Sequence, residues 1–223
     1  KSLVKEQFLA ELKALPQDMQ AETKKNFNLK EWLEKGIEII PDLYTCLAEK
    51  FGKLGEDWEV LKAEEQLYEP ITEFTDVDKK FKGFIDLVIM SKKDKKVHLI
   101  DWKTCSWGWQ PQKKNDKILS YQLVFYKHFW SKKYDVDPKD IECHFVLLKR
   151  TAKAGKKAEF VRVTAAKKRT TDALALLTKA LSNIEKKNYT KNRSACVSCK
   201  DRFGTCEFYK SKQIKEDRLL DLI

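Results

Sequence analysis

The sequence is poor in glycine, proline and long apolar runs, and each shortage excludes a class of protein. With 7 Gly and 5 Pro among 223 residues, it is neither collagen-like nor of low complexity. It has no apolar run of the ~18–20 residues that cross a membrane, so we expect no membrane partner. An initial Met and an apolar signal region are also missing, which predicts a trimmed chain of an intracellular, cytoplasmic protein.

Charge and aromatic content indicate a folded protein with a densely charged surface. Lys and Arg number 45 and Asp and Glu 34, which gives a formal net charge of +11. A surplus of this kind suits a polyanionic partner, although solubility explains it equally well. The 12 Phe, 7 Tyr and 6 Trp argue against disorder, because such side chains must be buried or used as contacts.

The hydrophobic pattern changes from helical to extended spacing and back along the chain. Residues 1–55 predict helices, with Pro41 opening a new helix at its first turn. Beyond them we expect strands over 58–71, 81–90 and 97–104, a helix over 115–133, strands over 141–149 and 158–164, and a helix over 170–187. This order predicts an α/β or α+β fold with a mixed central sheet.

The short polar stretch 91–96 predicts that the strands over 81–90 and 97–104 form a hairpin, and an aspartate interrupts each strand, Asp86 the first and Asp101 the second. Side chains alternate along a strand, so Asp101 and Lys103 share a face, and pairing near Asp86 would add a second carboxylate. Carboxylates in such apolar strands are costly unless they are paired or bind a cation. Oxygen ligands suit Mg²⁺ or Mn²⁺, and a nearby lysine could help water attack a phosphodiester. The alternative is a structural salt bridge.

The hairpin and the helix after it carry a recognisable set of residues: Gly83, Asp86, Asp101, Lys103, Gln122 and Tyr126. The pattern Gly-x-x-Asp, Asp-x-Lys, Gln-x-x-x-Tyr resembles the PD-(D/E)XK nuclease superfamily, specifically its RecB-type and phage-exonuclease-like branch. The resemblance implies a restriction-endonuclease-like core of mixed sheet flanked by helices.

The same resemblance implies a role for each residue of the set. Asp86 and Asp101 would bind Mg²⁺ or Mn²⁺, and Lys103 would be the catalytic lysine. Gln122 and Tyr126 would lie beside the site, and their i,i+4 spacing does place them on one helical face.

The family's first acidic residue should precede the Gly-x-x-Asp strand, where Glu64 and Glu65 are the candidates and Glu64 is preferred. RecB-type members often carry an upstream metal-binding His, which this chain lacks before His98. The positions of His98, His128 and His144 indicate the core edge or the surface. The phage-exonuclease-like members, which work without that His, are therefore the better match.

Three cysteines near the C-terminus have metal-ligand spacing, namely Cys196-x-x-Cys199 followed by Cys206. Iron–sulfur members of the superfamily place one Cys before the nuclease core, and Cys46 would be that fourth ligand of a [4Fe-4S] cluster. Zn²⁺ is the second possibility, and unligated cysteines are the third.

The loop between Lys103 and Gln122 combines aromatic and basic residues. Trp107 and Trp109 could stack on bases, and Lys113 and Lys114 could contact phosphates. Alternatively, one or both indoles pack beneath the loop.

These features favour a metal-dependent deoxyribonuclease. The resemblance to the phage-exonuclease-like branch implies, more specifically, an exonuclease acting on DNA ends in recombination, repair or phage replication. A structure-specific or single-strand DNA endonuclease is the nearest alternative. A non-catalytic nucleic-acid-binding module or a Cys-cluster scaffold is the alternative from another class. We expect an N-terminal helical region (1–57), a nuclease core (58–187) and a Cys-cluster tail (188–223) within one compact domain. Protein partners and oligomeric state stay open.

Overall fold

A computed structural model describes residues 2–26, 28–73 and 79–188. The chain divides into two compact units, Lys1–Thr178 and Lys179–Ile223, and the boundary falls inside the last described helix. The expected three-part division of the chain stays a prediction. No helix within the described ranges is long and apolar enough to cross a membrane.

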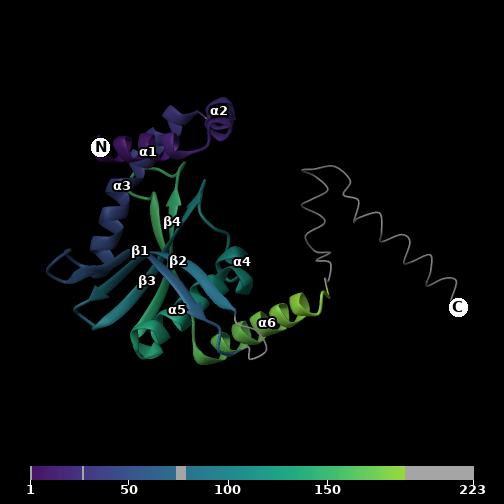
Figure 1. The fold of residues 1–223 in the computed structure, drawn as a ribbon. Coiled ribbons are helices and arrows are strands. Elements are labelled where there is room, and N and C mark those ends of the chain that lie inside the picture. The colour runs from purple at the N-terminus through teal and green to yellow at the C-terminus, as the bar shows by residue number, and fades with distance from the viewer. Residues whose placement is uncertain (1, 27, 74–78, 189–223) are drawn as a thin grey trace, which may run out of the picture. The chain divides into compact units, whose positions relative to one another are not determined.

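The elements follow the order expected from the hydrophobic pattern (Figure 1). They are α1 (Ser2–Ala14), α2 (Gln17–Asn26), α3 (Leu29–Phe51), β1 (Trp58–Pro70), β2 (Lys80–Ser91), β3 (Lys96–Cys105), α4 (Pro111–Lys114), α5 (Lys117–Tyr134), a 3₁₀ turn (Pro138–Asp140), β4 (Ile141–Lys149), β5 (Ala158–Val163) and α6 (Lys167–Glu185). The predicted mixed α/β fold is confirmed.

The described strands form one five-stranded sheet in the order β1-β2-β3-β4-β5. The β1–β2, β2–β3 and β4–β5 pairs are antiparallel, whereas β3 and β4 are parallel. A parallel pair needs a crossover connection, and α5 is the main helix of that connection. The crossover therefore places α5 beside the strands that carry the two aspartates.

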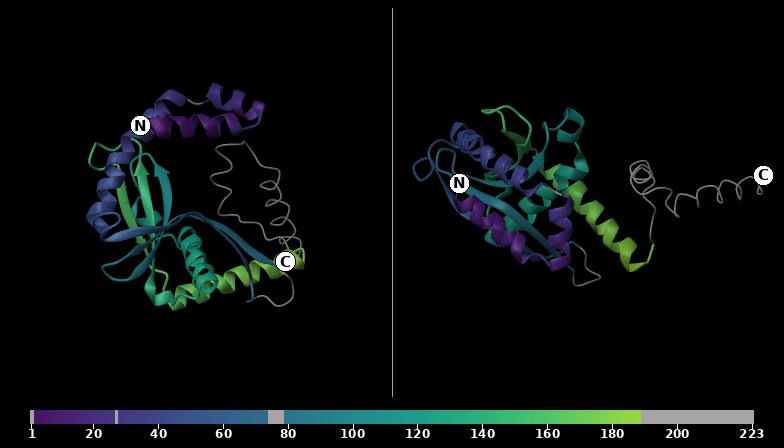
Figure 2. Two further views of the ribbon diagram at one scale, coloured as in Figure 1. Left: turned by 60° about the vertical axis from the view of Figure 1, so that its left-hand side comes forward. Right: turned by 90° about the horizontal axis from the view of Figure 1, so that it is seen from above.

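Helices α3 and α5 cover opposite faces of this sheet (Figures 1 and 2). On the α3 face a buried hydrophobic cluster joins the helix to four strands: Leu47, Phe51, Trp58, Ile89, Ile100 and Val146. On the other face α5 packs so closely that the Cys143 thiol of β4 contacts the carbonyl oxygen of Leu123 at 3.5 Å.

The expected helix start at Pro41 is wrong, because α3 runs through that proline without a break. Asn28 caps the helix by accepting a hydrogen bond from the Glu31 amide. Apolar residues at four-residue spacing, including Leu47 and Phe51, continue past the proline onto the sheet. Burial of this stripe outweighs the one backbone hydrogen bond that proline cannot donate.

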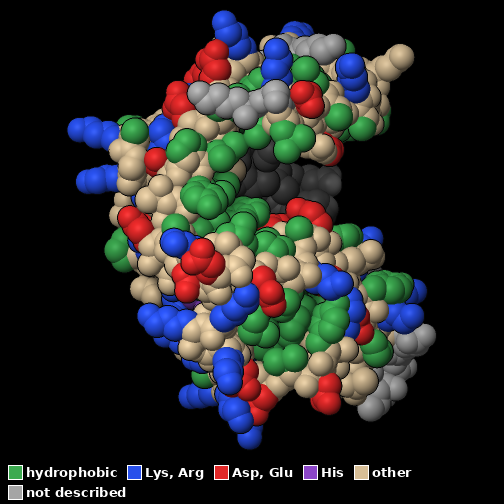
Figure 3. All heavy atoms as spheres, turned by 90° about the vertical axis from the view of Figure 1, so that its left-hand side faces the viewer, with side chains coloured by type: hydrophobic (Ala, Val, Ile, Leu, Met, Phe, Trp, Pro, Cys, Tyr) green, Lys and Arg blue, Asp and Glu red, His purple; other side chains and the backbone are tan. Residues whose placement is uncertain are grey.

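The basic surplus of the chain does not form a single basic stripe on the face shown in Figure 3. Lys and Arg side chains lie there among Asp and Glu side chains and hydrophobic groups. The net charge of the chain therefore does not by itself locate a nucleic-acid groove on this face.

Candidate active site

Asp86 lies on β2 where the β2–β3 ladder stops. The regular pairs end at Leu87 and Ile100, so the next step of the register sets Asp86 opposite Asp101. Asp86 Oδ2 accepts a hydrogen bond from the backbone N–H of Trp102 at 2.6 Å. The carboxylate thus uses a β3 amide at the position where the strands separate, and this contact fixes its orientation.

Asp101, Lys103 and Gln122 form a closed triangle of polar contacts between β3 and α5. The Lys103 ammonium lies 2.7 Å from Asp101 Oδ2 and donates to Gln122 Oε1 at 3.0 Å. Gln122 Nε2 donates to Asp101 Oδ1 at 2.7 Å. An ammonium only donates and a carboxylate only accepts, so these partners dictate which way the amide points.

Tyr126 completes the network one helical turn further along α5. Its hydroxyl oxygen accepts from Gln122 Nε2 at 3.0 Å, and its ring is buried. The structure therefore brings Asp101, Lys103, Gln122 and Tyr126 into one hydrogen-bonded group, with Asp86 on the adjoining strand.

The electrostatics of Asp101 favour a bound cation. The residue is 3% exposed, and this burial raises the pKa of its carboxyl group, against the hydrogen bond and charge of Lys103. The Asp86 carboxylate raises the same pKa by repulsion. Asp101 Oδ2 is buried and faces the Lys103 ammonium at 2.7 Å. Two carboxylates on adjoining strands, one of them destabilised by burial and repulsion, fit a divalent ion.

The two candidate glutamates of β1 lie in different surroundings. Glu64 lies opposite Asp86 in the β1–β2 register, since its neighbours in β1 pair with the neighbours of Asp86. It is exposed, and its φ of 51° is in the left-handed region. Glu65 is buried, and its carboxylate accepts from Lys133 at 2.7 Å and from the Tyr134 hydroxyl. The Glu65 carboxylate is thus hydrogen-bonded to side chains of α5.

Gly83 has a steric reason to lack a side chain. A Cβ at this position would lie 2.7 Å from Cε1 of Tyr126 and 3.0 Å from Cε1 of Phe81. Both distances are shorter than ordinary van der Waals contact, so a methyl group would displace the Tyr126 ring. The glycine of the Gly-x-x-Asp pattern therefore lets α5 approach β2 closely enough for the Gln122 network to form.

We expect Gly83→Ala to lower the free energy of unfolding by about 1–3 kcal/mol and to reduce nuclease activity, because overpacking moves Tyr126. Urea denaturation and a cleavage assay on the same protein measure the two effects. Gly36→Ala in α3 is the matched control, since no described atom outside the local helix backbone lies within 4 Å of its added Cβ. That change should stabilise by roughly 0.5–1 kcal/mol. Equal stability of the two variants would contradict this explanation.

The two tryptophans after β3 differ in exposure. Trp107 is 76% exposed, whereas the Trp109 ring packs against Phe145 with 5.3 Å between centroids. Lys113 lies over the Trp109 ring at 4.9 Å, and Lys114 forms an ion pair with Glu159. Of the residues predicted to bind nucleic acid, Trp107 has an indole that is free to stack on a base. The Trp109 indole packs beneath the loop instead.

Most of the predicted cysteine cluster lies outside the described residues, namely Cys196, Cys199 and Cys206. Cys46 lies on α3 and is half-buried, and desolvation raises the pKa of its thiol. Its proposed ligation of a cluster therefore stays a prediction.

The sheet order, the helices on both faces and the carboxylate–lysine group at the hairpin define a restriction-endonuclease-like nuclease fold. The chain belongs to the PD-(D/E)XK nuclease superfamily, whose family model matches residues 1–207. Nucleases of this superfamily hydrolyse nucleic acids and use divalent metal ions, so the protein is assigned to that class of hydrolase. A search of curated proteins finds no significant match to the sequence. Its relation to the RecB-type branch and to the iron–sulfur members stays a prediction.

The sequence interpretation missed a second group of potential metal ligands. His98, Glu142 and His144 bring their donor atoms within 4.8 Å of one another, and both histidines are buried rather than at the core edge or surface. The available signal was the alternation in β4, where Glu142 and His144 are two residues apart in an apolar strand.

Proposed function

We propose that the protein is an Mg²⁺- or Mn²⁺-dependent deoxyribonuclease that degrades DNA from its ends, in recombination, repair or phage replication. The observation that carries this proposal is the contact of Lys103 with both Asp101 and Gln122, beside the Asp86 carboxylate. An ammonium fixed between a carboxylate and an amide is oriented for chemistry, whereas a purely structural salt bridge has no need of the Gln122 contact.

Asp86, Asp101 and Glu64 would hold the metal ion. Glu64 is preferred to Glu65 because the Glu65 carboxylate is occupied by Lys133, while Glu64 is exposed opposite Asp86. The left-handed backbone of Glu64 supports this choice, since such conformations cluster at functional sites. When bound, the ion would supply Lewis acidity toward the scissile phosphate and the attacking water.

The residues of the chain itself would position the reactants. Lys103 would orient the attacking water and neutralise charge that develops on the phosphate. Asp101 and Gln122 would keep the ammonium in place, and Tyr126 would hold Gln122 through its hydroxyl oxygen. In this mechanism Lys103 would be the catalytic residue, and Gln122 and Tyr126 would be positioning residues.

Trp107 supports a preference for unpaired bases. Its exposed indole follows β3 two residues after Cys105, close along the chain to Lys103. Aromatic side chains stack on bases of any sequence, but only where the base is unstacked, as at a frayed end or in a single strand. Together with the resemblance to phage exonucleases, this favours an enzyme that acts at DNA ends.

Digestion of end-labelled linear DNA and covalently closed circles, single- and double-stranded, tests the proposal. We expect loss of the linear substrates with Mg²⁺ or Mn²⁺, none with EDTA, and intact circles. Cut circles would instead identify an endonuclease, structure-specific or single-strand-specific. Cleavage of none of these DNAs with any metal would overturn the deoxyribonuclease assignment.

A further inference from the structure

His98, Glu142 and His144 project from the sheet face opposite the nuclease residues. His98 pairs with Glu142, and Ile100 with His144, in the parallel β3–β4 ladder. Side chains two residues apart share a face, so all three lie on the α3 side, where Phe51 packs against the His98 ring at 4.8 Å. Asp101 is an odd number of residues from His98 and points to the α5 side.

The donor atoms of these three residues lie within 4.8 Å of one another, and two of the three separations already match ligands around one ion. Nδ1 of His98 lies 3.0 Å from Nε2 of His144, and that nitrogen lies 3.8 Å from Oε2 of Glu142. Nitrogen and oxygen ligands bound at ~2.0–2.2 Å from a common zinc ion lie about 3–4 Å from each other. The two rings are 3% and 0% exposed, so their positions are fixed by packing.

The remaining nitrogens of both rings show unfulfilled hydrogen-bonding capacity. His98 Nε2 and His144 Nδ1 are buried and have no hydrogen-bond partner among the described residues. The facing nitrogens share one proton in their hydrogen bond; with an ion between them, that proton would move to the far nitrogen of its own ring.

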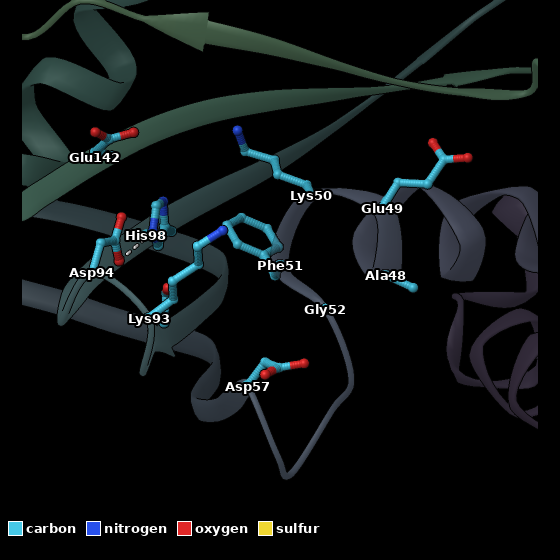
Figure 4. A pocket seen from close by; sticks show the side chains of 11 residues that line it. Ala48, Glu49, Lys50, Phe51, Gly52, Asp57, Lys93, Asp94, His98 and Glu142 are labelled. Atoms are coloured by element: carbon cyan, nitrogen blue, oxygen red, sulfur yellow. Dashed lines mark ion pairs between the residues drawn. The ribbon is translucent and has the colours of Figure 1, made fainter.

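Neighbouring side chains supply the outer contacts that metal ligands normally have. Nε2 of His98 faces Asp94 Oδ1 at 3.9 Å, drawn as the dashed line in Figure 4. Glu142 Oε1 accepts hydrogen bonds from Lys96 at 3.0 Å and from Arg162 at 3.1 Å. The other carboxylate oxygen, Oε2, lies on the side of His144. Hydrogen bonds that hold a ligating carboxylate, as Lys96 and Arg162 hold Glu142, orient ligands in known metal sites.

A pocket of about 490 Å³ gives access to His98 and Glu142 (Figure 4). Its charged lining has four acidic side chains and two lysines: Glu49, Asp57, Asp94, Glu142, Lys50 and Lys93. The pocket leaves room for water at an open coordination position.

We propose that His98, Glu142 and His144 bind a transition-metal ion of the Zn²⁺ type at a site separate from the hairpin carboxylates. Two imidazole nitrogens and one carboxylate suit Zn²⁺, whereas Mg²⁺ prefers oxygen ligands. The ion would link β3 to β4 beneath α3, with a fourth position open to the pocket. This inference does not depend on the proposed nuclease mechanism.

Histidine ring ¹⁵N resonances test the site directly, because the chain has 3 His and the third, His128, contacts Glu73 elsewhere. The sample is the full chain with Cys196→Ser, Cys199→Ser and Cys206→Ser, stripped with chelator. One equivalent of Zn²⁺ should shift the resonances of His98 and His144 and spare His128, and the same amount of Mg²⁺ should shift none. Unchanged His98 and His144 resonances, or a shift of His128 alone, would overturn the proposal.

Two variants separate this site from the hairpin. Glu142→Gln should weaken the Zn²⁺ affinity measured by these shifts at least about tenfold. Asp101→Asn should leave the Zn²⁺-induced shifts of His98 and His144 unchanged, because Asp101 lies on the other face. Loss of the shifts in Asp101→Asn, or full affinity in Glu142→Gln, would place the ion elsewhere and overturn the assignment.

Discussion

Lys103→Met is expected to abolish cleavage, by roughly 10³-fold or more, and to lower the stability of the protein as well. Cleavage is lost because the variant has no ammonium to orient water or to neutralise the phosphate. Stability falls because Asp101, which is 3% exposed, loses its counterion. We expect a loss of about 1–3 kcal/mol, less than the ~3–5 kcal/mol of a fully buried pair, since the Lys103 side chain is 27% exposed. Linear-DNA digestion and urea denaturation measure the two effects.

The chain contains a closely matched control for this variant. Lys133 lies 2.7 Å from the buried carboxylate of Glu65, and the exposures of that pair, 29% and 10%, resemble the 27% and 4% of Lys103 and Asp101. Lys133→Met should therefore lose comparable stability and keep its cleavage activity. If both variants lost cleavage to the same degree, general destabilisation would explain the result and Lys103 would lose its assigned role. The control also distinguishes Glu64 from Glu65, because freeing Glu65 should not affect a metal site built on Glu64.

The hairpin motif was predictable because it is encoded in neighbouring residues. Alternation places Asp101 and Lys103 on one face, and i,i+4 spacing aligns Gln122 with Tyr126. Both rules act within one element and need no tertiary information. The structure adds that the two pairs meet, since Gln122 contacts both Asp101 and Lys103.

Features that depend on distant residues were not predictable in the same way. The proposed preference for Glu64 over Glu65 rests on the contacts of Glu65 with Lys133 and Tyr134, which are 68 and 69 residues from Glu65 along the chain. Likewise, Pro41 predicts a helix start locally, yet packing of α3 on the sheet carries the helix through it.

The histidine group shows the same limit for a candidate site. His98 and His144 are 46 residues apart and become neighbours only through the parallel pairing of β3 and β4, which the α5 crossover creates. The sequence shows that Glu142 and His144 alternate in one strand. It does not show that the strand carrying His98 lies beside them.

Asp101→Asn is expected to lose cleavage as completely as Lys103→Met but to keep its stability, within about 1 kcal/mol, or to gain some. Asparagine preserves the shape and can still accept the Gln122 hydrogen bond, and it removes a buried charge that the Asp86 carboxylate repels. The Lys103 ammonium loses its counterion, but its side chain is 27% exposed and water can solvate it. The carboxylate would then cost folding energy, and binding of the proposed metal ion would be the reason to keep it.

Glu65→Gln is the contrasting control for that variant. Burial raises the pKa of Glu65, but the hydrogen bonds from Lys133 and Tyr134 outweigh this effect and hold it below its usual value. The charged form is thus favoured in the folded state, and Glu65→Gln should lose about 1–2 kcal/mol while cleavage persists. Thermal denaturation without metal compares the stabilities of the two variants. A cleavage assay and a calorimetric titration with Mn²⁺ then compare their activity and metal affinity. If Asp101→Asn lost as much stability as Glu65→Gln and still bound Mn²⁺ normally, Asp101 would be a structural residue, because its carboxylate would then stabilise the fold without binding the ion.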